Sequence, residues 1–241
     1  MNAGLIPTAI TVMNTVMNTE NSFGILRVMQ AFDSLFPVGA FTMSNGMETY
    51  TQKNIVKDTE SLFCYMQACL YAMKTNDLGF AAKSALGHDI AELDEICDAS
   101  KIPSELRNCS RKMCTRFIKT QLQIGRCEKL QEYSELISQK KCAGHYSIAA
   151  GLFISDTGAD KFTALQMFCY SQLSSLVNHA VKLVPLRQND GQTALAGIIP
   201  CIPDAVSYSM NLDLYDLGIS GAGFDLRSMQ HEKLYSRIYI S

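Results

Sequence analysis

The sequence predicts an all-α protein, a helical bundle formed by a single domain. Long segments repeat apolar residues every three or four positions, which is typical of amphipathic helices. No segment alternates convincingly between apolar and polar residues as a half-buried β-strand does. The 241 residues are 47% hydrophobic and 18% charged, a composition typical of globular domains. We expect the domain to occupy residues 25–217, between a loosely ordered N-terminal arm (1–24) and a C-terminal tail (218–241).

The first helix of the domain is predicted to begin at Ile25 and to stop before Pro37. Its apolar residues follow three- and four-residue spacing; they are Ile25, Leu26, Met29, Phe32 and Phe36. Pro37 and Gly39 interrupt the helix, so residues 37–47 should form a loop. We interpret Asn45-Gly46 as a turn between helices, because the flanking residues do not alternate as they would in a hairpin.

A strongly apolar helical segment is predicted over residues 58–87. Asp58 or Thr59 is a suitable N-cap, Asp77 begins a continuation, and Gly87 ends it. A helix that is apolar on all sides normally lies at the centre of a bundle. Five acidic residues follow within residues 89–98, and we expect them on a solvent-exposed helix face.

The next helix is predicted to start at Pro103, because proline suits a first helical turn. Its inner stripe consists of Leu106, Cys109, Met113 and Phe117. The same segment carries six basic residues with no acid among them: Arg107, Arg111, Lys112, Arg116, Lys119 and Arg126. These residues form either a solvated face or a docking face for an acidic partner. Nucleic acid is the less favoured partner, because no aromatic residues are interleaved with the cations.

The clearest amphipathic stripe in the chain runs from residue 162 to 184 and is closed by Pro185, which cannot continue a helix. A last long helix is predicted over residues 203–217, with Gly218 in the position that often follows a helix end. We interpret Asp190-Gly191 as a second turn between helices.

The sequence contains no recognisable catalytic or metal-binding motif. It lacks a P-loop for nucleotide phosphates and an HExxH zinc motif, and its nine cysteines contain no CxxC, so neither a disulfide framework nor a zinc site is indicated. An enzyme that pairs a cysteine nucleophile with a remote histidine stays open as an alternative. A nucleic-acid-binding helical module using the basic face also stays open, although the net charge of −2 argues against it.

The sequence also bears on location. Residues 1–26 contain neither Lys nor Arg, so the basic start of a leader peptide is missing. No apolar run of about 18 residues that could span a membrane is present. We therefore expect a cytoplasmic protein that has no membrane partner.

Three blocks of sequence resemble a known family. They are FDSLFPVGAFTMSNGME at residues 32–48, LVPLRQNDGQ at 183–192 and DLRSMQHEKLYSRIYIS at 225–241. In this order they strongly resemble the urease accessory protein UreF family, from about residue 25 to the C-terminus. Three residues depart from the family pattern: Ala40 and Met47 change side-chain volume, and Arg187 puts local partner contacts in doubt.

The resemblance implies a cytoplasmic, all-helical homodimer without catalytic chemistry of its own. Such proteins bridge a UreD/UreH-type protein, which docks on urease, and a UreG-type GTPase that carries nickel. The assembly delivers Ni²⁺ to apo-urease when GTP is hydrolysed. The resemblance thus implies that nickel and GTP are handled by partner proteins and that this chain holds no tightly bound cofactor, no metal site and no catalytic residue.

The resemblance places candidate contacts for the GTPase in the first two blocks. Pro37 and Gly39 could turn Phe41 and Glu48 outward; the alternative is a tight structural turn that needs positive φ at Gly39 and Gly46. Long polar side chains cluster around the Pro185 break and suit recognition of a partner; they are Lys182, Gln188 and Gln192.

The C-terminal tail is the candidate contact for the UreD/UreH-type protein. Gly218, Gly221 and Gly223 should decouple it from the last helix, so we expect a mobile segment that folds on binding; the alternative is packing on its own domain. The candidate contact residues are Met229, His231, Glu232, Tyr235, Arg237 and Tyr239, in a composition typical of binding hot spots. Tyr170, one position off the inner stripe of its helix, could lie at this interface or a dimer interface, or be a half-buried core residue.

Overall fold

The computed structural model describes residues 22–40, 43–219 and 221–240 of the chain. These residues form helices and connecting turns without any β-strand, so the prediction of a single all-α domain is confirmed. A first helix covers 22–32 and is followed by α2 (Met47–Gln52), α3 (Thr59–Met73), α4 (Asp77–Leu86), α5 (Ile90–Ser100), α6 (Ser104–Ile124), α7 (Glu128–Ser138), α8 (Tyr146–Thr157), α9 (Lys161–Leu183), α10 (Gln188–Ile198), α11 (Ile202–Asn211) and α12 (Ala222–His231).

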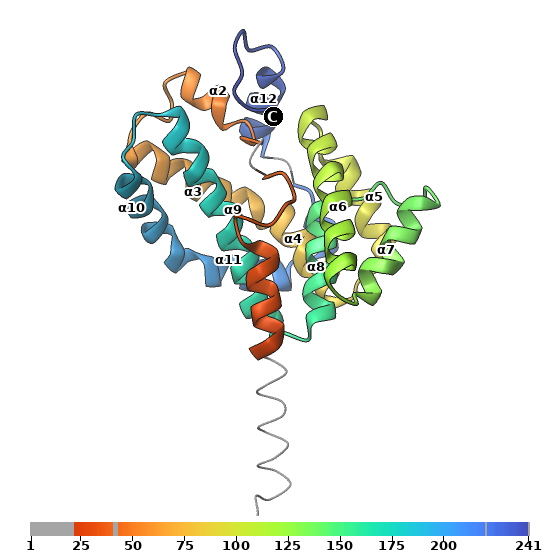
Figure 1. Cartoon of the computed structure of the whole chain (residues 1–241). Coiled ribbons are helices and arrows are strands. Elements are labelled where there is room, and N and C mark those ends of the chain that lie inside the picture. The colour runs from red at the N-terminus through yellow and green to blue at the C-terminus, as the bar shows by residue number, and fades with distance from the viewer. Residues whose placement is uncertain (1–21, 41–42, 220, 241) are drawn as a thin grey trace, which may run out of the picture.

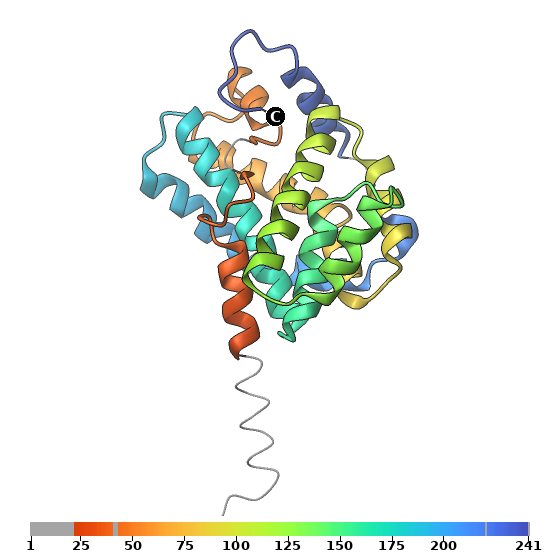
Figure 2. The same ribbon diagram turned by 45° about the vertical axis from the view of Figure 1, so that its right-hand side comes forward.

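The helices form two groups on either side of a central layer (Figure 1). One group contains α5, α6 and α7, and the other contains α2, α3, α10 and α11, while α4, α8 and α9 lie between them. The view turned by 45° in Figure 2 shows the helix 22–32 beside α9, at the front of this central layer. The C-terminal residues 221–240 lie at the opposite end of the molecule from the start of that helix.

The pair α4 and α8 forms the centre of the core. Most of the residues of both helices are buried, as the apolar composition of the 58–87 segment predicts for its α4 part. Gly151 on α8 allows this close packing, because a Cβ at that position would lie 2.1 Å from the carbonyl oxygen of Ala81 on α4. Any side chain larger than a hydrogen atom would therefore push the two helices apart.

An aromatic cluster joins the helix 22–32 to the central layer. The Phe32 ring lies 5.2 Å from that of Phe168 on α9, and the Phe117 ring on α6 lies 5.5 Å from that of Phe153 on α8. The Phe32 and Phe117 rings are stacked at 6.3 Å. Because aromatic pairs of this kind stabilise a core beyond their buried area, the cluster fixes the first helix against the bundle.

Local helix signals are found where the sequence predicts them. Asp58 caps α3 by accepting a hydrogen bond from the Ser61 amide at 2.9 Å, and Gly87 ends α4 with a φ of +90°. Gly39 and Gly46 both have positive φ, as a tight turn in the first block requires. Pro185 follows the end of α9.

Three predicted elements are wrong in detail. The first helix ends at Phe32 rather than Phe36, because the Asp33 carboxylate accepts the Leu35 amide and starts a turn. The last long helix ends at Asn211, and residues 214–216 form a separate 3-10 turn (η3) that Asp213 caps. Asp190-Gly191 lies inside α10 and is not a turn between helices.

The expected solvent-exposed acidic face at residues 89–98 is also partly wrong. Asp94 is buried, and its carboxylate accepts hydrogen bonds from the Tyr133 hydroxyl and from the Ala143 and Gly144 amides. This carboxylate ties α5 to α7 and to the loop that leads into α8. The helices α7 and α8 themselves have no counterpart in the sequence prediction.

Candidate partner-binding surfaces

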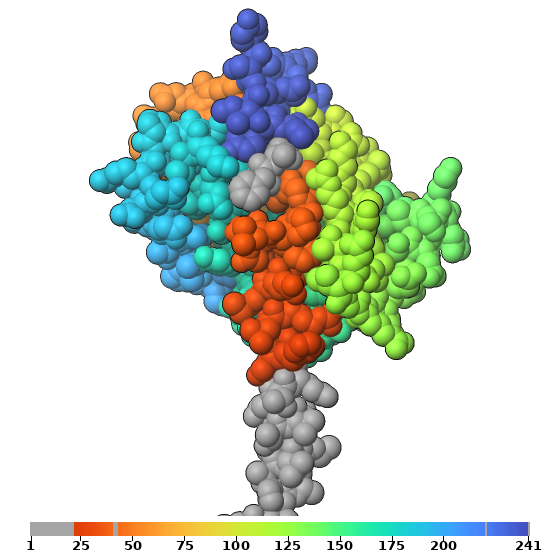
Figure 3. Space-filling model, viewed as in Figure 1, coloured from red at the N-terminus to blue at the C-terminus, as the bar shows by residue number. Residues whose placement is uncertain are grey.

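The C-terminal residues 221–240, which we call the C-terminal segment, are packed on the domain. The helix α12 lies against α2 and α6, and the space-filling view in Figure 3 shows the segment covering the top of the molecule. His231 and Tyr239 are buried. The structure therefore differs from the expected mobile tail and matches the alternative, in which the segment packs on its own domain.

A charged cluster with a buried centre at Glu48 and His231 holds this segment, and we call it the carboxylate cluster (Glu48, Glu105, His231 and Arg237). The His231 Nδ1 lies 2.8 Å from Glu105 Oε2, and its Nε2 lies 3.1 Å from Glu48 Oε2. The Arg237 guanidinium donates to Glu105 Oε1 at 2.7 Å. The cluster thus joins α2 and α6 to α12 and to the residues that follow α12.

Glu48 occupies a different position from the one expected. The residue is 2% exposed, so the expectation that Glu48 faces outward is wrong. Gly46 stands at the N-cap of α2 with a φ of +78°, and the short helix that follows directs Glu48 inward. There the carboxylate also accepts the Ile238 and Tyr239 amides at 2.8 and 3.1 Å, which fixes the backbone of the last residues.

The C-terminal segment exposes large apolar side chains among charged ones such as Glu232 and Lys233. Five of its large apolar side chains are exposed, and we call them the C-terminal apolar surface: Leu226, Met229, Tyr235, Ile238 and Ile240. A group of exposed apolar residues on one segment is typical of an interaction site. Its backbone is held by the carboxylate cluster, so this surface is presented in an ordered form.

The predicted contact residues of the tail separate into two groups. Met229 and Tyr235 belong to the C-terminal apolar surface, and Glu232 is exposed and accepts a hydrogen bond from Ser104. His231 and Tyr239 are buried inside the protein's own fold, so the structure does not present them to a partner. They position the segment instead, and Arg237 does so through its ion pair with Glu105.

Tyr170 lies on a groove along α9. The groove has a volume of about 580 Å³ and is bordered by the helix 22–32, α9 and the start of α11. Its apolar lining includes Met29, Met167 and Ile199. Tyr170 is 42% exposed here, so part of its side chain is open to solvent.

The residues around the Pro185 break are on the surface. Lys182 near the end of α9 is exposed, as are Gln188 and Gln192, one turn apart on α10. Arg187 forms an exposed ion pair with Asp190 at 3.0 Å, and this pair caps α10. Phe41, the other residue expected on this side, lies outside the described residues.

The six basic residues expected on one face are largely engaged within the chain. Arg107 donates to the backbone carbonyls of Lys101 and Ile102, and Arg111 pairs with Asp98. Arg116 donates to the Val38 carbonyl, and Arg126 pairs with Glu128. Lys112, Arg116 and Lys119 are nevertheless exposed on α6 at positions i, i+4 and i+7, so three cations share one face of this helix. The face lacks the interleaved aromatic residues that favour nucleic-acid binding.

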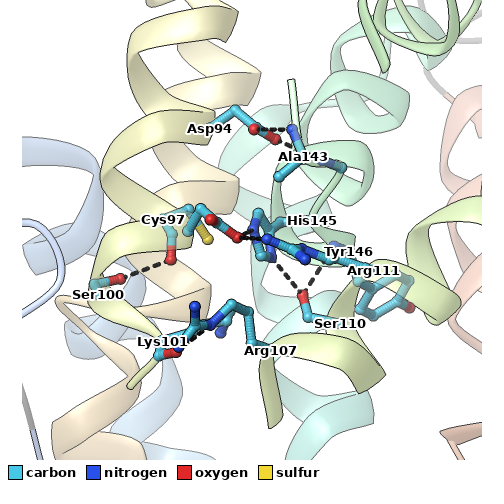
Figure 4. A network of polar contacts seen from close by, with 12 residues as sticks. Asp94, Cys97, Ser100, Lys101, Arg107, Ser110, Arg111, Ala143, His145 and Tyr146 are labelled. Atoms are coloured by element: carbon cyan, nitrogen blue, oxygen red, sulfur yellow. Dashed lines mark hydrogen bonds and ion pairs between the residues drawn. The ribbon is translucent and has the colours of Figure 1, made fainter. Parts of the chain in front are cut away.

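Ser110 and His145 meet in the network that Figure 4 shows, and Asp98 is bonded to the same histidine. The His145 ring lies 3.2 Å from Ser110 Oγ and 3.0 Å from Asp98 Oδ1. Burial, together with Lys101 nearby, lowers the pKa of His145. Burial alone would raise the pKa of Asp98, but hydrogen bonds from Arg111 and His145 outweigh it and lower the pKa.

This arrangement resembles a catalytic triad only in residue type. Ser110 Oγ accepts the Tyr146 amide, and the Asp98 carboxylate is shared with Arg111. The cavity that Ser110 lines measures about 120 Å³, well below the ~300–1,000 Å³ of small-molecule sites. The geometry favours a structural role, in which the network joins α5, α6 and the start of α8.

The cysteines do not favour the alternative of a thiol enzyme. Burial raises the pKa of Cys69, Cys97 and Cys169 to about 12 and that of Cys142 to about 11. A nucleophilic cysteine needs a lowered pKa.

Within residues 22–40, 43–219 and 221–240, no three His, Cys, Asp or Glu side chains are grouped so that they could hold a metal ion. No helix of this part of the chain is long and apolar enough to cross a membrane.

The fold and these surfaces define an all-α protein with exposed apolar side chains on its C-terminal segment. Comparison with known sequences identifies the family. The UreF family profile matches residues 56–199. The urease accessory protein UreF of Actinobacillus pleuropneumoniae serotype 5b (strain L20) is 36% identical over 221 residues, which cover 89% of this chain and 97% of the relative. The same protein of serotype 3 (strain JL03) is 35% identical with the same coverage. The chain belongs to the UreF family of urease accessory proteins, which confirms the resemblance carried by the three blocks.

Proposed function

We propose that this protein is a scaffold for urease maturation. It acts in the cytoplasm, bridges a UreD/UreH-type protein and a UreG-type GTPase, and so enables nickel insertion into apo-urease on GTP hydrolysis. It modulates the GTPase by holding it in this complex. The observation that carries the proposal is the ordered C-terminal apolar surface, which the domain presents to solvent through the carboxylate cluster.

The C-terminal apolar surface is proposed to bind the UreD/UreH-type protein. Tyr235 and Ile238 on it are 106% and 72% exposed, so both are available to a partner. Tyrosine is enriched at binding hot spots, where a few residues carry most of the binding energy. Because the Glu48 carboxylate already fixes the Ile238 and Tyr239 amides, little ordering entropy opposes docking.

The Pro185 break is proposed to face the GTPase. Lys182, Gln188 and Gln192 offer long polar side chains there, and Arg187 adds an exposed cation on the same turn. In Figures 1 and 2 this turn lies beside α2, in the same half of the molecule as the C-terminal segment. Glu48 takes part only indirectly, by holding that segment. Nickel and GTP are held by the partners.

A second copy of the chain is proposed to cover the α9 groove and complete a homodimer. Tyr170 lies on this groove with Met29, and Leu26 on the same helix is also exposed. A twofold dimer needs a patch that can pair with itself, and a shallow apolar groove beside an exposed tyrosine suits this. The variant Tyr170→Ser should shift the chain from dimer to monomer in analytical ultracentrifugation; an unchanged dimer would overturn this part of the proposal.

The whole proposal is tested by nickel-dependent activation of urease. Apo-urease, the UreD/UreH-type protein, the UreG-type GTPase, GTP and Ni²⁺ are combined with and without this chain, and complexes are isolated in parallel. Activation and a complex with both accessory proteins should depend on the chain. Equal activation without it would refute the scaffold function. Deleting residues 224–241 should abolish capture of the UreD/UreH-type protein, but it also exposes Glu48 and Glu105, so substitutions on the outer face give the sharper comparison.

A further inference from the structure

We infer that His231 is a buried imidazolium ion and that loss of its proton releases the end of the C-terminal segment, so that pH regulates the display of the C-terminal apolar surface. The role of this surface in partner binding rests on the proposed function. The release itself is a property of the isolated chain and can be measured without any partner.

With Glu48 and Glu105 both ionised, the hydrogen-bond geometry needs protons on both ring nitrogens. Nδ1 faces Glu105 Oε2 at 2.8 Å and Nε2 faces Glu48 Oε2 at 3.1 Å. Ionised carboxylate oxygens can only accept hydrogen bonds, and a neutral imidazole has one donor nitrogen and one acceptor nitrogen. Only the imidazolium can donate to both carboxylates at once.

The charge balance of the cluster also indicates that His231 is an imidazolium ion. The His231 side chain is completely buried, and the side chains of Glu48 and Glu105 are 3% and 19% exposed. Two carboxylates in such a site need two cations, because an unpaired buried charge is costly. Arg237 supplies one through its 2.7 Å contact with Glu105, and the second is the His231 imidazolium.

The charged groups described around the cluster come from three elements. α2 contributes Glu48, and α6 contributes Glu105. The segment after α12 contributes Arg237. On α12 itself, the Arg227 guanidinium lies over the Tyr50 ring and donates to Gln230. The remaining charged neighbours of His231 are Glu232, which accepts from Ser104 Oγ at 2.7 Å, and the exposed Lys233.

Loss of the proton acts on the end of the chain through Glu48. In a neutral His231, one ring nitrogen carries no proton. The lone pair of this nitrogen would face a carboxylate oxygen, so a hydrogen bond would become a repulsion. Glu48 also accepts the amides of Ile238 and Tyr239, so a displaced Glu48 releases both. Tyr239 would then leave the His179 ring, whose centroid is 4.9 Å away, and Ile238 and Ile240 would lose their fixed position. The segment is therefore held at lower pH and released as the pH rises.

Amide hydrogen exchange of the full-length chain tests the release. Protection of Ile238 and Tyr239 is measured at about pH 6 and about pH 8.5 and is corrected with an unstructured peptide of residues 232–241. Protection should fall about ten- to a hundredfold at the higher pH, as expected when a charge-assisted hydrogen bond is lost. Equal protection at both values overturns the inference.

Two further measurements separate the role of His231 from general pH effects. The variant His231→Gln should show low protection of Ile238 and Tyr239 at both pH values, whereas His88→Gln should behave as the wild type; a wild-type pH response in His231→Gln overturns the inference. Nitrogen-15 NMR of the histidine rings is measured on the wild-type chain, so its result does not depend on whether a variant folds. It should show both His231 nitrogens protonated at about pH 6, and one bare nitrogen there overturns it. Failure of partner capture alone, with these results intact, would refute only the proposed function.

Discussion

Replacing Glu48 by glutamine should open the C-terminal segment while leaving the rest of the domain folded. Glu48 accepts three hydrogen bonds, from His231 Nε2 at 3.1 Å, the Ile238 amide at 2.8 Å and the Tyr239 amide at 3.1 Å. A glutamine side chain keeps one acceptor oxygen, but its amide nitrogen is a donor that faces other donors. It also removes a negative charge that faces His231.

The size of the effect follows from the number of bonds lost. A hydrogen bond to a charged group contributes about 1.5–3 kcal/mol, and Glu48→Gln loses one to two of the three. We expect a local loss of about 3 kcal/mol, which corresponds to an increase of about a hundredfold in the open population. Because the bonds hold the backbone directly after Arg237, the opening makes the Arg237–Ile238 bond accessible to protease.

Limited trypsin digestion with intact-mass analysis measures this opening, because cleavage follows the open population when reclosing is fast. The rate of cleavage after Arg237 should rise by about a hundredfold in Glu48→Gln. Glu132→Gln, which changes an exposed carboxylate on α7, is the matched control and should be cleaved as the wild type. Equal rates for the two variants would show that the Glu48 carboxylate does not hold the segment.

Three further predictions concern the domain. Asp94→Asn should lower the free energy of unfolding by about 3–5 kcal/mol in urea titration, because the buried carboxylate loses charge-assisted bonds; a loss below about 1 kcal/mol would contradict the bonding described. Gly191→Ala should lower the melting temperature, since its Cβ would lie 2.7 Å from Val177 Cγ1, and an unchanged value would show that the helices move apart freely. Burial and the nearby Lys182 lower the pKa of His179 to about 4, so below about pH 6.5 the unfolded chain binds a proton that the folded chain rejects. Stability should therefore fall by up to about 3 kcal/mol between about pH 6.5 and pH 4, and His179→Gln should reduce this fall; an equal fall in the variant would assign it to other groups.

The parts of the fold that were predictable have local causes. Asp58 caps α3 through a residue three positions away, Gly87 adopts a positive φ at the end of α4, and Pro185 prevents α9 from continuing. Each of these effects is contained within one or two helical turns. The segments that these residues bound, 58–87 and 162–184, were therefore assigned correctly as helical.

The missed element α8 has a different cause. Nearly all of its residues are buried, because it lies at the centre of the bundle. A helix without a solvent-exposed face has no polar stripe, so the spacing of its apolar residues carries no helical period. Its only sequence signal is a short apolar run at residues 148–154, which could equally indicate a buried strand.

The candidate site was predictable in its residues but not in their roles. The third sequence block contains Tyr235 and Met229, and both lie on the exposed surface. The inward position of Glu48 was not predictable, because its partner His231 is 183 residues away. The spacing of Gly218, Gly221 and Gly223 indicates a hinge, but Gly221 is the N-cap of α12 and Gly223 lies inside that helix.

The affinity of the UreD/UreH-type protein for two tyrosine variants of this chain tests the central claim most directly. Tyr235 on the C-terminal apolar surface and Tyr215 on η3 are both fully exposed, at 106% and 96%, so replacing either with serine should leave the fold intact. Tyr235→Ser should weaken binding at least about tenfold, as expected for a hot-spot residue, while Tyr215→Ser should bind as the wild type. Equal affinity of the two variants would contradict the claim that the C-terminal segment is the surface by which this protein binds that partner.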